Sequence, residues 1–255
     1  MFYILLPAYN EEKAISALLE RIQAALTVMD IDYRVLVVND GSTDGTLAIL
    51  HRYQELLPLE VLDHGVNKGL GQAMLSGLSR AAGLLRDEDV LITMDADNTH
   101  DPCLIEEMRA RIAEGADLVI ASRYERGGAE VGLSKLRSFL SRGASTLLKI
   151  FFPIPGAKDF TCGYRAYQGA ALRRAYRVYG IRLVEERGFT CMAEILVKMG
   201  ALSIRVSEVP LVLRYDLKAG PSKMKVMRTI LRYFVLIART LELRRGKLNE
   251  SKYPA

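Results

Sequence analysis

The interpretation of this sequence depends first on one stretch, Val90-Leu91-Ile92-Thr93-Met94-Asp95-Ala96-Asp97. Its mostly apolar first part has the length of a buried strand, and two carboxylates separated by one small residue follow at once. A solvated loop that caps the next helix is the ordinary explanation of an isolated Asp-x-Asp. A hard divalent cation is the other explanation, because it takes oxygen ligands and leaves coordination sites for water or substrate phosphates.

Apolar segments of strand length alternate with helical segments on both sides of this stretch. Strands are predicted at 3–6, 34–38, 59–62, 90–94 and 118–122. Helices are predicted at 11–29, from an N-cap within 42–44 to 57, at 69–85 and at 101–114. Continuous apolar strands separated by helices predict an α/β fold, with a mostly parallel central sheet that helices cover on both faces.

Polar, acidic or glycine-containing segments follow four of these strands. They are Pro7-Ala8-Tyr9-Asn10-Glu11, Asn39-Asp40-Gly41-Ser42, Asp95-Ala96-Asp97 and Ser122-Arg123-Tyr124. In such sheets ligands bind beyond the carboxyl ends of the strands, so all four segments are expected at one edge. This shared place favours a metal and phosphate site at Asp95 and Asp97 over a solvated loop. It also makes Asp40 a candidate acceptor of hydrogen bonds from a base or a ribose.

The pattern loosens after residue 123. A glycine-containing loop, a basic helix, a proline-flanked loop at 153–156 and one more strand at 203–213 are predicted. In the basic helix, Lys135, Arg137 and Ser141 fall close to one face. A guanidinium group suits phosphate oxygens, although a solvated helix face explains the same spacing.

Composition restricts the class of protein. The 255 residues allow one domain, or one domain with an appended element, and the net charge is +5. Cys103, Cys162 and Cys191 have neither metal-site nor disulfide spacing, which indicates reduced thiols in the cytoplasm. No apolar run reaches the roughly 18 residues of a membrane span. No nucleic-acid motif with interleaved aromatic residues is visible, so nucleic acid is not expected as a partner.

Basic residues concentrate in 214–252, where they far outnumber acidic ones. Apolar residues recur there at helical spacing: Met227, Ile230, Leu231, Phe234, Ile237, Ala238 and Leu241. A basic amphipathic helix of this kind lies in an anionic membrane interface, and the apolar segment 147–153 is a second candidate for such contact. Packing on the domain or a homodimer contact explains the same pattern.

A long ordered series of motifs resembles family 2 glycosyltransferases. Besides the strand-end segments, the series includes Asn67-Lys68-Gly69-Leu70-Gly71, Arg137 with Ser141 and Arg142, 159–165, 188–194, 208–210 and 220–223. The most similar branch is that of the dolichol-phosphate mannose synthases and related polyprenyl-phosphate sugar transferases. The resemblance covers roughly residues 3–225. It implies a GT-A catalytic domain at 1–222, followed at 223–255 by the basic amphipathic helix and tail.

The resemblance also implies roles for individual residues. The nucleoside is expected to be held by Pro7, Tyr9, Glu11, Val38 and Asp40. The diphosphate, with Mg²⁺ or Mn²⁺, is expected at Asp95, Ala96 and Asp97. Arg123 is expected near the donor, Arg137 and Ser141 at the entering acceptor phosphate, and Arg214 and Lys223 over the diphosphate. The expected catalytic residues are Asp97, Arg123, Arg137 and Ser141.

Two positions depart from the family pattern. Thr99 stands where the family often has a glutamine metal ligand, so a hydroxyl or a water would have to substitute, and Asp95 and Asp97 are the two expected ligands. The spacing from Arg214 to Lys223 is lengthened by residues 216–219, which leaves the role of Arg214 open.

The expected reaction is transfer of a hexose, with inversion, from a nucleotide-sugar to a polyprenyl or dolichyl phosphate. Mannose from GDP-mannose is the favoured donor, and the enzyme is expected at the cytoplasmic face of the membrane as a peripheral protein. A lipid phosphate is largely ionised near pH 7 and needs no strong general base. The alternative is a UDP-sugar-dependent transferase acting on a polyprenyl phosphate or on a sugar hydroxyl. A hydroxyl acceptor needs a carboxylate base, for which Asp159 and Glu194 are candidates, with a structural role equally open for each. A non-catalytic nucleotide or nucleic-acid binder is a third hypothesis, and it predicts that Asp97→Ala leaves binding unaffected.

Overall fold

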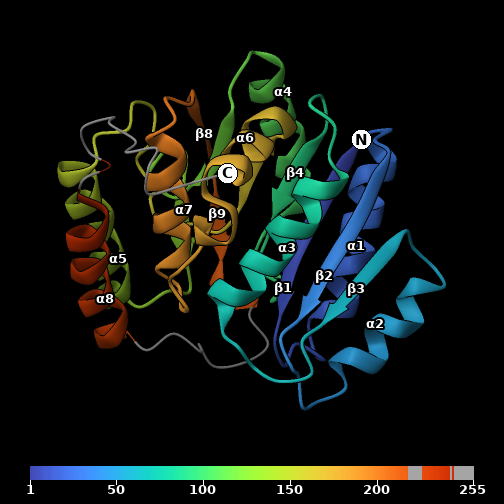
Figure 1. The fold of residues 1–255 in the computed structure, drawn as a ribbon. Coiled ribbons are helices and arrows are strands. Elements are labelled where there is room, and N and C mark those ends of the chain that lie inside the picture. Colours follow the sequence, from blue (N-terminus) through green and yellow to red (C-terminus); the bar gives the residue numbers. More distant parts are fainter. Residues whose placement is uncertain (218–225, 242, 244–255) are drawn as a thin grey trace.

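The computed structural model describes residues 1–217, 226–241 and 243, without the side chains of 135, 137 and 226–228. Its centre is a seven-stranded sheet in the order β3-β2-β1-β4-β7-β5-β8 (Figure 1). These strands are β1 Phe2–Ala8, β2 Tyr33–Asn39, β3 Leu59–Asp63, β4 Val90–Thr93, β5 Leu118–Ser122, β7 Arg165–Gln168 and β8 Val206–Pro210. The five strands predicted in the first half of the chain are therefore confirmed.

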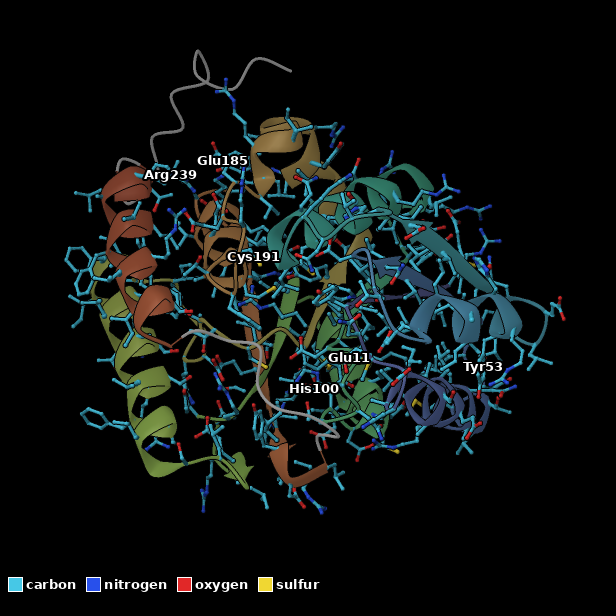
Figure 2. The ribbon with its side chains drawn as sticks, turned by 90° about the horizontal axis from the view of Figure 1, so that it is seen from below. Glu11, Tyr53, His100, Glu185, Cys191 and Arg239 are labelled. Atoms are coloured by element: carbon cyan, nitrogen blue, oxygen red, sulfur yellow. The ribbon has the colours of Figure 1, made fainter. Side chains whose placement is uncertain are left out.

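Burial on both faces explains the apolar strands. Every residue of β4 and β5 is buried, and Val35 to Val38 of β2 are fully buried. The helices are α1 Ile15–Val28, α2 Thr46–Gln54, α3 Leu70–Leu84, α4 Ile105–Ala113, α5 Lys135–Phe151, α6 Gly169–Tyr179, α7 Cys191–Gly200 and α8 Val226–Thr240. Helices α3 and α6 lie on one side of the sheet and α1 and α4 on the other (Figure 2). The α/β fold with helices on both faces is thus confirmed.

The registers bring the strand ends together. Strand β1 runs parallel to β2 with Ala8 opposite Asn39, and β2 runs parallel to β3 with Asn39 opposite Asp63. Strand β4 is parallel to β1 on the other side. The carboxyl ends of these strands therefore share one edge, and the loops that follow them meet there.

Strand β7 departs from the predicted topology. It lies between β4 and β5 and is antiparallel to both. The sequence pattern missed it because Arg165 is polar but fully buried, where its guanidinium donates to the backbone oxygens of Met192 and Phe160. A parallel sheet interrupted by one antiparallel strand is still mostly parallel, as expected.

The single strand predicted at 203–213 is wrong, because the chain forms two strands there. Strand β8 ends at Pro210, which has no N–H to continue the ladder. Strand β9, Val212–Arg214, leaves the main sheet and pairs in parallel with β6, Ala129–Val131. This small second sheet joins the segment after β5 to the segment before the C-terminal helix.

Helices α5 and α8 pack against each other beyond the β8 edge of the sheet (Figure 1). The helix predicted in the C-terminal segment is confirmed for residues 226–240, whereas the proposed boundary at 222 and 223 lies outside the described residues. Helix α8 buries Tyr233, Leu236 and Ile237. Among the described residues, no helix combines the length and the hydropathy that a membrane span requires.

Candidate active site

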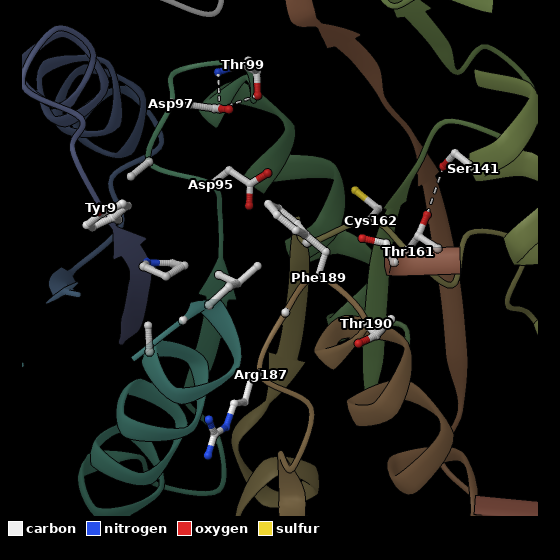
Figure 3. Close-up of a pocket in the computed structure, with 18 of the residues that line it drawn as sticks. Tyr9, Asp95, Asp97, Thr99, Ser141, Thr161, Cys162, Arg187, Phe189 and Thr190 are labelled. Atoms are coloured by element: carbon white, nitrogen blue, oxygen red, sulfur yellow. Dashed lines mark hydrogen bonds between the residues drawn. The ribbon is translucent and has the colours of Figure 1, made fainter. Parts of the chain in front are cut away.

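A cavity of 880 Å³ opens at the carboxyl ends of the strands (Figure 3). Its lining takes residues from all four strand-end segments that the sequence singled out. The floor and one wall include Pro7, Tyr9, Glu11, Asp40, Asp95, Ala96, Asp97, Thr99 and Arg123. Further lining residues come from α5, α8, residue 185 and residues 187–190. The prediction that the four segments share one edge is confirmed.

Asp40 lies at the end of the cavity where Pro7, Tyr9 and Glu11 gather, and its side chain has several hydrogen-bond partners. The Oδ1 atom accepts from the N–H of Lys68 at 2.9 Å, and Oδ2 accepts from the N–H of Gly69 at 2.8 Å. The Nδ1 atom of His64 lies 2.8 Å from Oδ1. Asp40 therefore shapes the loop that starts α3 while it lines the cavity.

The positions of His64 and Val38 differ from the sequence-based expectations for this end of the cavity. His64 was not predicted, yet its ring bridges Asp40 and the hydroxyl of Ser76 on α3, which lies 2.9 Å from Nε2. Only the fold brings these groups together, because they come from three separate elements. Val38 is fully buried in β2 and is not among the described lining residues of the cavity.

Asp95 and Asp97 occupy the centre of the cavity floor, directly after β4 (Figure 3). The Oδ1 atom of Asp97 accepts from the Thr99 hydroxyl at 2.6 Å and from the Thr99 N–H at 3.3 Å. The N–H of Asp95 donates to Nδ1 of His100 at 3.2 Å, and the His100 ring stacks on Tyr164. Thr99 therefore orients Asp97 through a hydrogen bond, and His100 fixes the backbone at Asp95.

The chemistry of this donor set fits a hard divalent cation. Within the described residues, no group of three or more His, Cys, Asp or Glu side chains could hold a metal. Two carboxylates on a strand end, facing a large cavity, match a cation whose remaining positions are filled by water and substrate phosphates. Such a cation would bind together with a phosphate-containing ligand.

Arg123 lies in the cavity wall and is held by carboxylates. Its Nε and Nη2 atoms donate to the two oxygens of Asp159 at 2.8 and 2.7 Å, and Nη1 donates to Glu130 at 3.1 Å. Burial alone would lower the pKa of Arg123, but the charge of Asp159 and the hydrogen bonds to it, together with other nearby groups, outweigh burial and raise that pKa. The guanidinium is therefore permanently charged, and it joins β5, β6 and the segment before β7.

The two candidate carboxylate bases have structural roles. Asp159 is fully buried on Arg123, and Glu194 is fully buried between Lys198, at 2.8 Å, and Arg239, at 2.6 Å. Neither belongs to the described lining of the cavity. Because a general base must reach the proton that it removes, neither carboxylate is placed to serve as one.

Three hydroxyl groups meet at the α5 end of the cavity. The Tyr124 hydroxyl donates to Oγ of Ser141 at 3.0 Å, and Ser141 lies 3.3 Å from the hydroxyl of Thr161 (Figure 3). Burial raises the pKa of Tyr124 to about 12, so its hydroxyl stays protonated at neutral pH. Arg137 lies one turn before Ser141 on α5, and its side chain lies outside the described residues.

Comparison with known proteins agrees with this geometry. Residues 3–177 match the family model described as glycosyl transferase family 2. The chain belongs to this family. It is therefore a glycosyltransferase, an enzyme that transfers a sugar from an activated donor.

Named relatives of this glycosyltransferase act on lipid phosphates. It is 34% identical to the dolichol-phosphate mannosyltransferase of Pyrococcus furiosus, over 94% of this chain and 63% of that protein. It is 31% identical to the polyprenol monophosphomannose synthase of Mycolicibacterium smegmatis, over 87% of this chain and 80% of the relative. It is 34% identical to the undecaprenyl-phosphate mannosyltransferase of Micrococcus luteus, with 86% of each chain covered. The chain thus spans somewhat less than two thirds of the archaeal relative.

Solved structures share the GT-A fold. Glucosyl-3-phosphoglycerate synthase from Mycobacterium tuberculosis, in complex with Mg²⁺ and uridine-diphosphate, aligns with a TM-score of 0.66 at 16% identity, over 95% of this chain and 79% of that chain. Mannosyl-3-phosphoglycerate synthase from Rubrobacter xylanophilus aligns with a TM-score of 0.64 at 20% identity, over 100% of this chain and 78% of that chain. At these identities the likeness concerns the fold alone.

The C-terminal side of the glycosyltransferase site differs from the sequence-based expectation. The guanidinium of Arg214 is exposed and pairs with Asp216 at 2.8 Å, and Arg214 is not among the described lining residues. Only the backbone N–H of Arg214 approaches the site, where it donates to the backbone carbonyl oxygen of Thr99 at 3.3 Å. Lys223 lies outside the described residues.

Helix α8 contributes cavity residues that the sequence did not reveal. They are Thr229, Ile230, Arg232 and Tyr233. In the sequence these residues belong to a basic amphipathic pattern, which indicates one buried face but not what that face covers. The packing of α8 beside α5 makes the buried face part of the enzyme's cavity.

Proposed function

We propose that this glycosyltransferase transfers mannose from GDP-mannose to the phosphate of a polyprenyl or dolichyl lipid. The observation that carries the proposal is the continuity of the cavity. One space of 880 Å³ extends from Tyr9 and Asp40, past Asp95 and Asp97, to Ser141 on α5. This order matches a ligand with a nucleoside, a diphosphate and a sugar, followed by an acceptor at the far end. The names of the relatives support mannose as the sugar and a lipid phosphate as the acceptor.

In this proposal the strand ends bind the donor. Pro7, Tyr9, Glu11, Asp40 and the backbone at Val38 form the nucleoside end. Asp95 and Asp97 would hold Mg²⁺ or Mn²⁺, and Ala96 would lie at the diphosphate. When bound, the cation neutralises negative charge that builds on the leaving diphosphate. Thr99 keeps Asp97 oriented for this task through its 2.6 Å hydrogen bond, rather than by ligating the cation.

The acceptor phosphate would enter between α5 and the cavity floor. A phosphate monoester is mostly ionised at neutral pH, so it can displace the diphosphate directly, with inversion, without a general base. The ion-paired state of Asp159 and Glu194 agrees with this. Ser141 would donate a hydrogen bond to the phosphate, and Arg137 would pair with it. Arg123 holds the wall behind Ser141, and Lys223 would approach the diphosphate from the C-terminal side. Arg214 could do so only after its guanidinium leaves Asp216.

A lipid acceptor requires the enzyme to work at a membrane surface. Helices α5 and α8 both carry large exposed apolar side chains: Leu136, Phe139, Ile150, Leu231, Phe234 and Val235, and Leu241 follows α8 directly. Together with the basic residues of the C-terminal segment 223–255, they support peripheral attachment to an anionic leaflet at its cytoplasmic face. The same apolar side chains would alternatively fit a homodimer contact.

Transfer of label into lipid tests the proposal. The protein is incubated with Mg²⁺ or Mn²⁺, a short polyprenyl phosphate and GDP-[¹⁴C]mannose, and the products are partitioned between solvent and water. We expect label in the solvent phase with wild type and a loss of at least about 100-fold with Asp97→Asn. A parallel reaction with UDP-[¹⁴C]glucose tests the alternative donor. Label that stays in water for every donor contradicts a lipid acceptor.

A further inference from the structure

Two arginines of α8 bind a buried carboxylate, Glu186, whose sequence neighbours Glu185 and Arg187 line the cavity. The side chain of Glu186 has no exposed surface. Its two oxygens accept from Nε and Nη2 of Arg232 at 3.0 and 2.9 Å, and Nη2 of Arg239 lies 3.2 Å from Oε1. The Thr190 hydroxyl donates to the same carboxylate at 2.8 Å. In the part of the chain that the structure describes, the two cations that compensate Glu186 therefore come from α8.

The backbone at Glu186 and Arg187 packs against the turn that starts α3. The N–H of Gly71 donates to the backbone oxygen of Arg187 at 2.9 Å. A Cβ atom at Gly71 would lie 1.6 Å from the backbone oxygen of Glu186, and one at Gly69 would lie 2.7 Å from that of Arg187. Only glycine permits this approach, so the two backbones are in direct contact.

The same turn belongs to the nucleoside end of the cavity. Gly69 lines the cavity, and its N–H together with that of Lys68 donates to the carboxylate of Asp40. A continuous series of contacts thus leads from α8 through Glu186 to the Gly69–Gly71 turn and Asp40. Each step in it is a hydrogen bond, an ion pair or a backbone contact.

We propose that Glu186 is a positioning residue, and that its ion pairs with α8 hold the Gly69–Gly71 turn in the conformation that binds the nucleotide. A buried carboxylate that loses its cations is strongly disfavoured, so residues 186–187 move when α8 moves. Arg232 and Arg239 are 45% and 37% exposed, which lets water compete for them and makes their pairs separable without unfolding the domain. The position of α8, which lies beside the proposed lipid site, thereby sets the affinity for the nucleotide-sugar donor.

Arg239 gives a cleaner variant than Arg232 for testing this coupling. Arg232 lines the cavity and so is able to touch a ligand directly, whereas Arg239 is not among the described lining residues. Arg239 also pairs with Glu194, but Glu194 keeps Lys198 at 2.8 Å and the backbone N–H groups of Glu185 and Glu186. Figure 2 shows Arg239 at the end of α8 beside Glu185, well away from Glu11 and His100 at the strand ends.

Hydrogen exchange and nucleotide affinity together test the proposal. In ligand-free Arg239→Gln we expect faster amide exchange in residues 67–72 and unchanged exchange in β2. The Kd for GDP with Mg²⁺, from titration calorimetry, should rise by roughly 2- to 30-fold, the range of coupling found between packed sites. Arg239→Lys should restore both quantities. Arg177→Gln, at an exposed arginine of α6, is the matched control and should change neither.

The results of this experiment distinguish a failure of the coupling from a failure of the proposed function. The coupling rests on the proposed function only because that function names the ligand as a nucleotide. Unchanged exchange in residues 67–72 overturns the series of contacts. Faster exchange in residues 67–72 with an unchanged Kd for GDP overturns the effect of α8 on nucleotide affinity. Equally faster exchange in β2 means that Arg239 stabilises the whole domain and not the turn in particular. If wild type binds neither GDP nor UDP, the donor assignment fails, while the exchange measurement still decides whether α8 holds the turn.

Discussion

Replacing Asp159 with asparagine would remove the negative charge beside Arg123 while nearly preserving the shape of the side chain. Asp159 is fully buried, and its carboxylate accepts from Nε and Nη2 of Arg123 at 2.8 and 2.7 Å. It also accepts from the backbone N–H groups of Thr161 and Cys162, each at 3.1 Å. An asparagine amide cannot accept all of these bonds, and it leaves a buried guanidinium with less compensation.

The cost follows from the burial of this pair. Removing one partner of a buried ion pair costs about 3–5 kcal/mol. Glu130 still accepts from Arg123 at 3.1 Å, so the lower end, about 3 kcal/mol, is expected for Asp159→Asn. For a domain of this size, 1 kcal/mol changes the melting temperature by about 2–4 °C, so a decrease of about 6–12 °C is expected.

The loss should depend on pH in a defined direction. Burial alone would raise the pKa of Asp159, but the charge of Arg123 and the hydrogen bonds outweigh it and lower that pKa. The carboxylate therefore stabilises the fold fully above the unfolded-state pKa of about 3.9, and this stability is lost as the pH falls through the lower folded-state value. The difference between wild type and Asp159→Asn should shrink as the pH is lowered below about 4.

Urea denaturation followed by circular dichroism measures both effects, from pH 7 down to pH 3. The control is Asp87→Asn, because Asp87 pairs with Arg173 at the surface with 70% of its side chain exposed. That exposed pair should contribute less than about 1 kcal/mol. A variant at Asp159 that is as stable as the Asp87 control at pH 7 would refute the reasoning. So would a difference that stays constant as the pH is lowered.

Four other variants, at three positions, test individual contacts. Gly71→Ala should lose about 1–3 kcal/mol of stability by thermal denaturation, because its Cβ would lie 1.6 Å from the Glu186 oxygen; an unchanged melting temperature contradicts that contact. Burial raises the pKa of Glu208. A glutamine at this position keeps a side-chain oxygen that can accept from the two backbone N–H groups bound by Glu208, so Glu208→Gln should be tolerated at pH 7. Glu208→Ala should instead lower the free energy of unfolding by about 1–3 kcal/mol for each of the two backbone N–H groups that lose their acceptor. Equal urea midpoints for Glu208→Gln and Glu208→Ala would argue against this role of the Glu208 oxygen. His64→Ala removes a partner of Asp40 and should weaken GDP binding by about 0.5–1.5 kcal/mol in calorimetry, with unaltered affinity as the opposing result.

The fold was largely predictable because strands of a parallel sheet that are buried on both faces consist of continuous apolar residues. Strands β1 to β5 lie within two residues of the predicted ranges at nearly every end. Strand β6 and helices α6 and α7 were also not predicted, and two of the elements missed, β7 and α7, lack such a signal. Strand β7 contains the buried Arg165, and helix α7 is buried on every side, including Glu194 and Lys198, so it shows no amphipathic period.

The sequence by itself determined where the chemistry lies. Asp95 and Asp97 directly follow an apolar strand, and their position at the ligand edge of a parallel sheet follows from the strand direction alone. The tertiary structure decided which charges remain for ligands. Arg123 faces Asp159, Asp40 faces His64, and Glu186 receives its cations from α8. These pairs join residues 24 to 53 positions apart in the chain, from Asp40–His64 to Glu186–Arg239. Local periodicity carries no information on which buried charges meet, because that depends on how the helices pack across the sheet.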